Sequence, residues 1–207
     1  MKVQASATRM ELMNLKKRLV VARRGHKLLK DKLDELMRRF LGMIKGYKDL
    51  HQQVEKDLLK AHYHFQFTRA MMSPIDLHEA LMSSPEGHIC VKVSWENIMS
   101  VLAPRMEIEG EVSAGQYGYA ATGADLDLAM FHYKRVLPRL LELAARRRSL
   151  QLMASEIEST RRRVNALEYI LIPGIQETIR DIVMRMNELE RSNLTRMMRV
   201  KEIVRKH

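Results

Sequence analysis

The sequence predicts a mainly α protein, a long antiparallel two-helix coiled coil with a small mixed insert containing a short β-hairpin. Charged residues make up 29% of the 207 residues and aromatic residues only 5%, and there are 16 Met. That composition is typical of long helices with adaptable apolar seams. Apolar residues recur at steps of three and four toward both ends of the chain, while proline and glycine gather in the middle.

A first long helix is predicted over residues 8–73. Thr8 to Glu11 form a capping-box pattern, in which each side chain can bind a free backbone N–H of the first turn. An a/d heptad stripe follows, with one extra four-residue step that locally relaxes a supercoil. Ser73 precedes Pro74 and should end the helix. The stripe consists of Leu12, Leu15, Leu19, Ala22, His26, Leu29, Leu33, Leu36, Phe40, Met43, Tyr47, Leu50, Val54, Leu58, Ala61 and Phe65.

Residues 74–123 are predicted to form a small globular insert. Pro74 favours the first turn of a short helix, which should end near Ser83. Apolar and polar residues then alternate, as on a half-buried strand, and the stretch 98–103 should pair back as a hairpin. The alternating apolar residues are Ile89, Val91, Val93 and Trp95.

A second long helix is predicted over residues 124–205. Its stripe is interrupted at Arg146–Arg148, and the Pro173-Gly174 pair should kink the helix without ending it. Neither helix is stable alone with an exposed apolar seam, so the two are expected to pair antiparallel, with both termini at one end. The stripe consists of Leu126, Met130, Tyr133, Leu137, Leu140, Ala144, Leu150, Met153, Ile157, Thr160, Val164, Leu167, Leu171, Ile179, Ile182, Met186, Leu189, Asn193, Met197, Val200 and Val204.

Positive charge is concentrated at the end where the termini meet. The chain has 36 Lys and Arg against 25 Asp and Glu, a net charge of +11. Residues 9–39 hold eleven cations against four acids, and residues 191–207 hold six against one, so the rest is near neutral. Such a surplus favours an acidic partner: nucleic acid, an anionic membrane or an acidic protein cavity.

No enzymatic site can be argued from the residues. The sequence contains no phosphate-binding loop, HExxH motif or paired-cysteine site, so no catalytic residue, metal ligand or cofactor is expected. His62 and His64 should point to different helix faces, and Cys90 is expected to be a small packed side chain. His26 and Asn193 fall on the stripes, where a polar residue sets register. The start lacks a signal-peptide core and no apolar run is long enough to span a bilayer, so a cytosolic protein is expected, held at a membrane only through partners.

Two stretches carry a family resemblance. The first comprises Thr8–Leu12, Arg24–Lys32 and Asp34–Leu36. The second comprises Ser155–Glu158, Thr160–Tyr169 and Ile172-Pro173. They resemble the N-terminal and C-terminal helices of the D subunit of V-type (archaeal and bacterial V/A-type) ATPases. In the insert, the resemblance is chiefly in Asn97–Val101.

The resemblance implies a central rotor shaft, one copy per complex, that is not itself catalytic. Its tip would enter the hexamer of A and B subunits, with the F subunit bound nearer the insert and the far end in a funnel-shaped socket subunit on the membrane ring. The shaft would couple ATP hydrolysis or synthesis to proton or sodium transport at the cytoplasmic face of the membrane. The candidate contacts to the hexamer are Arg9, Lys16, Lys17, Arg23, Arg24, Lys27, Arg191, Arg196, Arg199 and Arg205, and the candidate register or kink positions are His26, Pro173 and Asn193.

Two other classes of function fit the composition. A basic coiled coil can bind nucleic acid, although the sequence shows no aromatic and basic stacking face or recognition motif. A scaffold or tether would need no defined hexameric partner. Co-purification with A, B and F distinguishes the three hypotheses.

Overall fold

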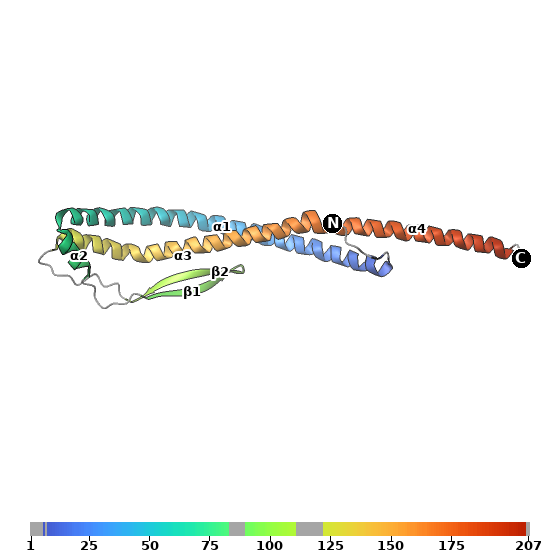
Figure 1. Ribbon diagram of the computed structural model, residues 1–207, viewed down its shortest axis with the longest axis horizontal. Coiled ribbons are helices and arrows are strands. Elements are labelled where there is room, and N and C mark those ends of the chain that lie inside the picture. Colours follow the sequence, from blue (N-terminus) through green and yellow to red (C-terminus); the bar gives the residue numbers. More distant parts are fainter. Residues whose placement is uncertain (1–5, 7, 83–89, 111–121, 206–207) are drawn as a thin grey trace. The chain divides into compact units, whose positions relative to one another are not determined.

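The computed structural model describes residues 6, 8–82, 90–110 and 122–205. Its elements in chain order are α1 (Arg9–Met71), α2 (Pro74–Met82), β1 (Cys90–Ile98), β2 (Val101–Glu109), α3 (Ala124–Ala166), the π-helical turn η1 (Leu167–Leu171) and α4 (Ile172–Arg205) (Figure 1). The predicted fold class, long helices with a small β-hairpin between them, is confirmed. Two compact units divide the chain. The terminal unit is Met1–Glu35 with Ile157–His207, and the central unit is Leu36–Glu156.

In the terminal unit, the first part of α1 packs antiparallel to η1 and α4. Arg9 pairs with Glu190, whereas His26, further along α1, pairs with the earlier residue Glu168. The residue number of the partner decreases as the residue number in α1 increases, so the two helices are antiparallel. An apolar cluster between the helices excludes water and stabilises the pair. Its buried members are Leu15, Ile175 and Ile182, and the half-buried side chains packed on them are Leu12, Leu19, Ile179 and Met186.

In the central unit, the second part of α1 runs antiparallel to α3. The guanidinium of Arg146 donates to the carbonyl of Gly46 at 3.4 Å, and Arg139 pairs with Asp57. Further along α1, Nδ1 of His62 lies 2.6 Å from the hydroxyl oxygen of Tyr133 on α3. The partner numbers fall again, as in the terminal unit.

The predicted stripe of α1 is confirmed, because all of its side chains are buried or half-buried. The most deeply buried stripe residues are separated by multiples of seven residues on each side of residues 37–53: Leu15, Ala22 and Leu36 come first, and Val54 and Ala61 follow, joined by Thr68, which was not part of the predicted stripe. The predicted extra four-residue step runs from Val54 to Leu58 and therefore falls at the start of the second set, where the stripe stays on one face. The N–H of Glu11 donates to Oγ1 of Thr8 at 3.3 Å, which is one of the two hydrogen bonds of the predicted capping box.

The stripe of the second long helix was predicted wrongly at three places. Ala144 is exposed and Ala145 is buried instead, because α3 advances by four-residue steps through Ser149 to Met153. Leu171 is exposed at the end of η1. From Leu189 onward the stripe is exposed, because α1 begins at Arg9, which pairs with Glu190. The exposed distal members are Leu189, Asn193, Met197, Val200 and Val204.

The chain stays helical through Pro173, with one widened turn just before it. The N–H of Ile172 donates to the carbonyl of Leu167, five residues back, and α4 continues from there. Proline has no N–H and its ring crowds the carbonyl four residues earlier, so a wider turn relieves both problems. The expected absence of a complete break is therefore observed, while the expected kink stays a prediction.

The insert contains the expected short helix and hairpin. α1 ends at Met71, two residues before Ser73, and α2 begins at Pro74. β1 and β2 are antiparallel and joined by a two-residue turn at Met99 and Ser100, whose φ angles are 53° and 74°. Positive φ at both positions suits the twist of a tight hairpin. The N–H of Ser100 donates to Oδ1 of Asn97 at 2.9 Å, which holds the turn.

The expectation of a half-buried first strand is wrong for the described residues. Val91, Val93 and Trp95 are 44%, 46% and 64% exposed, and Ile89 lies outside the described residues. The buried residues are instead in β2, which lies nearer to α3 than β1 does (Figure 1). They are Val101, Ala103 and Pro104. The alternation therefore identified a strand correctly but did not show which strand would pack on the helices.

Candidate protein-contact surface

All ten of the predicted contact residues belong to the terminal unit. Six lie on α1 and four on α4, and every one of them is exposed. None of the ten residues lies on the buried stripe. The helical backbone therefore directs each of their side chains away from the packed seam and toward solvent. We call this set of ten residues the basic surface.

Within the described residues, only one member of the basic surface has an ion-pair partner. Arg9 lies 3.1 Å from Glu190, and the two side chains are 81% and 58% exposed. Such an exposed pair contributes little to stability. The other nine cations have no acidic partner in the part of the chain that the structure describes. Their mutual repulsion is unfavourable, and an acidic protein surface would relieve it.

The last turns of α4 add apolar side chains to these cations. Every residue from Asn187 to Arg205 is exposed. A soluble helix seldom exposes so many large apolar side chains unless another surface covers them. They are Leu189, Leu194, Met197, Met198, Val200, Ile203 and Val204. This segment of α4 is amphipathic and basic, and no described part of the chain covers it.

The three predicted register or kink positions lie in different settings. His26 is half-buried, and its Nε2 lies 3.2 Å from Oε2 of Glu168, so it joins the two helices of the terminal unit through a polar contact. Pro173 follows η1 in the first turn of α4 and is exposed. Asn193 lies in the exposed end of α4. The roles of the three residues in register or bending stay predictions.

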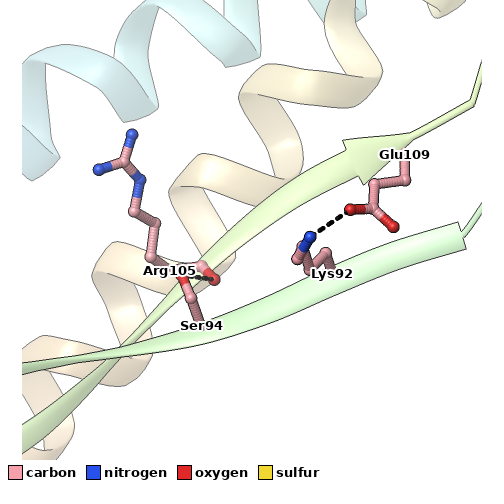
Figure 2. A network of polar contacts seen from close by, with 4 residues as sticks. All are labelled: Lys92, Ser94, Arg105 and Glu109. Carbon is pink, nitrogen blue, oxygen red and sulfur yellow. Dashed lines mark hydrogen bonds and ion pairs between the residues drawn. The ribbon is translucent and has the colours of Figure 1, made fainter.

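The hairpin has one polar and one apolar face. Lys92 Nζ lies 2.6 Å from Oε1 of Glu109, and the hydroxyl of Ser94 donates to the carbonyl of Arg105 at 3.4 Å, as Figure 2 shows. Residues directly opposite each other in a ladder share a face. The apolar face is therefore made of the cross-strand pairs Val91–Ile108, Val93–Met106, Trp95–Pro104 and Asn97–Leu102, and it carries no charge.

Comparison with known proteins identifies the family. The family model of the ATP synthase D subunit matches residues 11–202. The chain belongs to this family. Proteins named as the D subunit of V-type ATP synthase from Acetivibrio thermocellus, Thermoanaerobacter pseudethanolicus and Clostridium botulinum are 50%, 48% and 51% identical to it. The alignments cover 98%, 99% and 99% of this chain and 92%, 98% and 96% of those relatives.

Membership of this family of ATP synthase D subunits agrees with the expectation of a non-catalytic subunit in a larger complex. It does not favour the nucleic-acid-binding or scaffold hypotheses. Among the described residues, no three His, Cys, Asp or Glu side chains come close enough to hold a metal ion. None of the helices, over their described residues, is both long and apolar enough to cross a bilayer.

Sequence reasoning missed several buried residues of this family member. Thr68, Ser149 and Thr178 are buried, and each hydroxyl donates to the carbonyl four residues back at 2.8–2.9 Å. This bond satisfies the hydroxyl within its own helix, so a polar side chain can face the seam. Position was the available signal for Thr68, because it falls seven residues after Ala61.

Proposed function

We propose that this chain is the central rotor shaft of a V/A-type rotary ATP synthase. One copy turns inside a hexamer of A and B subunits and couples ATP hydrolysis or synthesis to proton or sodium transport by the membrane ring. The complex lies at the cytoplasmic face of the membrane. The F subunit binds nearer the insert, and a funnel-shaped socket subunit holds the far end.

The observation that carries this proposal is the exposed end of α4 in a member of this family. A long basic and apolar helix end that no described residue of the chain covers needs a cavity to enter. A ring of subunits around an axle supplies such a cavity. Exposed charge pairs are individually weak, so contacts of the basic surface can break and re-form as the shaft turns.

The shaft also needs a structure that transmits torque. Buried residues at heptad spacing lock α1 to its antiparallel partner helix within each unit. The apolar, uncharged face of the hairpin belongs to the central unit, and the residues of the basic surface belong to the terminal unit. That face supports the binding of a second partner such as F near the insert.

Reconstitution tests the proposal. The full chain is mixed with purified A and B subunits and with F, and co-elution and ATP hydrolysis are measured. We expect a complex with one copy of the chain per ring, and a rate of ATP hydrolysis that changes when the chain is present. If the ring hydrolyses ATP identically with and without the chain, and the chain never co-elutes with it, the proposal is wrong.

A matched pair of variants locates the contact. Arg196→Gln with Arg199→Gln removes two charges from the exposed end of α4, whereas Lys134→Gln with Arg135→Gln removes two exposed charges from α3. We expect the first pair to weaken ring binding and the second to leave it unchanged. Equal weakening by both pairs would mean that only the net charge of the chain matters.

A further inference from the structure

A groove of about 490 Å³ lies in the terminal unit beside the widened helical turn. Leu15, Ala22 and Ile175 line it and are 1%, 9% and 7% exposed, so they form an apolar floor. Val21 and Leu171 form its sides and are 68% and 46% exposed. The residues of the floor are buried, and the sides present apolar surface to solvent.

The origin of the groove is the change of helical period at η1. A π-helical turn holds more residues than an α turn, so the residues that follow rotate relative to the seam. Leu171, which the heptad stripe predicted to be buried, is thereby turned outward. Opposite it, the seam of α1 carries the small residue Ala22. The gap is therefore built by the sequence on both helices.

The open space continues along α1. Gly25 follows Val21 and Ala22 by four and three residues, so the three share one face of the helix. Apart from the neighbouring residues and backbone of its own helix, a side-chain carbon added at Gly25 would meet no atom within 4 Å. A partner could therefore approach the helix backbone at this point.

Two cations stand at the rim of the groove. Lys17 and Arg18 line it and are exposed, and neither has an ion-pair partner among the residues that the structure describes. An apolar floor with unpaired cations beside it complements a partner surface that offers apolar side chains flanked by carboxylates.

We propose that this groove binds an acidic amphipathic helix of the surrounding A/B ring. One or two aliphatic or aromatic side chains of that helix enter between Val21 and Leu171, and its carboxylates pair with Lys17 and Arg18. The inference rests on the proposed rotor function and adds to it a specific apolar anchor next to the basic surface.

The test measures the affinity of the full chain for the purified A/B ring. Val21→Gln and Leu171→Gln remove the apolar sides of the groove. Because both residues are exposed, neither change should alter thermal unfolding of the free chain. We expect each to weaken ring binding about tenfold, the cost of one lost apolar anchor.

The matched control is Val20→Gln. Val20 is 48% exposed and adjacent to Val21, but it does not line the groove, since successive helical residues point about 100° apart. It should bind the ring like the unchanged chain. Lys17→Glu with Arg18→Glu should weaken binding more than tenfold and make the residual binding less sensitive to salt.

Two results would overturn the inference, and they are distinguishable. If the unchanged chain binds the ring and Arg196→Gln with Arg199→Gln weakens it, but Val21→Gln and Leu171→Gln do not, the groove is not the anchor and the rotor proposal stands. If the unchanged chain does not bind the ring at all, both proposals fail. Equal weakening by Val20→Gln and Val21→Gln would also reject a specific groove.

A fluorescent label gives a second measurement. An environment-sensitive dye is attached to the thiol that Leu171→Cys introduces, in a chain that also carries Cys90→Ser, because Cys90 is the only native cysteine and is exposed. Addition of the ring should shift its emission to the blue as the groove is covered. An unchanged spectrum in a chain that co-elutes with the ring would contradict the proposal.

Discussion

The guanidinium of Arg9 lies 3.1 Å from the carboxylate of Glu190, and every described residue beyond this pair in α4 is exposed. Arg9 is also the first residue of α1. The pair therefore marks the place where the two-helix packing of the terminal unit ends. The rest of α4 is a single amphipathic helix, which alone is marginally stable in water.

Removal of residues 192–207 is expected to leave folding intact and to weaken assembly. None of the described residues removed is buried, so the free energy of unfolding should change by less than about 0.5 kcal/mol. Affinity for the A/B ring should fall at least about tenfold, since several apolar and basic contacts are lost together. Thermal unfolding and ring binding measure the two effects. A large drop in melting temperature would show that the segment packs against the rest of the chain.

Ile182→Ala is expected to destabilise the terminal unit by about 3 kcal/mol. Ile182 is 2% exposed and packs in the cluster with Leu15 and Ile175, so its truncation leaves a cavity. The neighbouring change Val183→Ala affects a side chain that is 39% exposed and should cost about 1 kcal/mol or less. Urea unfolding of the full chain compares the two. Similar costs would mean that the seam does not pass through Ile182.

The ion pair between Asp57 and Arg139 should contribute more than the pair between Glu158 and Arg162. The first joins two helices, and its side chains are 27% and 38% exposed, whereas the second lies within one helix at 3.7 Å with side chains 69% and 73% exposed. We expect coupling energies of about 1 kcal/mol and less than about 0.3 kcal/mol. Double-mutant cycles to alanine measure both, and equal values would contradict this ranking.

Much of the fold could be predicted because heptad spacing constrains long helices strongly. All of the α1 stripe is buried or half-buried, since one face of α1 packs on an antiparallel helix within each unit. The prediction of buried positions was wrong where the helical period changes locally. Packing sets the four-residue steps from Ala145 to Met153. Pro173 accounts for the π turn at Leu167–Leu171. Periodicity alone shows neither of these.

The candidate surface was predictable only in part. The charge counts along the sequence placed the cations in the segments that form the terminal unit. Their side chains could be expected to be exposed, because they lie off the apolar stripe. The groove beside Leu171 could not be predicted, since it depends on a local change in the helical backbone. The exposure of β1 was also beyond the pattern, because alternation identifies a strand but does not show whether that strand packs on the helices.

The last prediction concerns alkaline pH. Burial raises the pKa of the Tyr133 phenol above its usual value of 10.0, and its hydroxyl lies 2.6 Å from Nδ1 of His62. The folded chain therefore keeps this proton to higher pH than the unfolded chain does. The contribution of the neutral phenol to stability is complete below pH 10.0 and is lost as the pH rises through the raised folded-state pKa.

Tyr133→Phe removes both the hydrogen bond and the titrating group. Near pH 8 the variant should be less stable by about 0.5 kcal/mol, because one exposed hydrogen bond is lost. This deficit should shrink as the pH rises above 10.0. There the phenol ionises more readily in the unfolded chain than in the folded chain, which lowers the stability of the unchanged protein but not that of the variant, which has no phenol. Tyr169→Phe is the control, since Tyr169 is 71% exposed and should have no effect at either pH. Urea unfolding at the two pH values measures the difference, and a deficit that grows with pH would show that the folded state favours the phenolate instead.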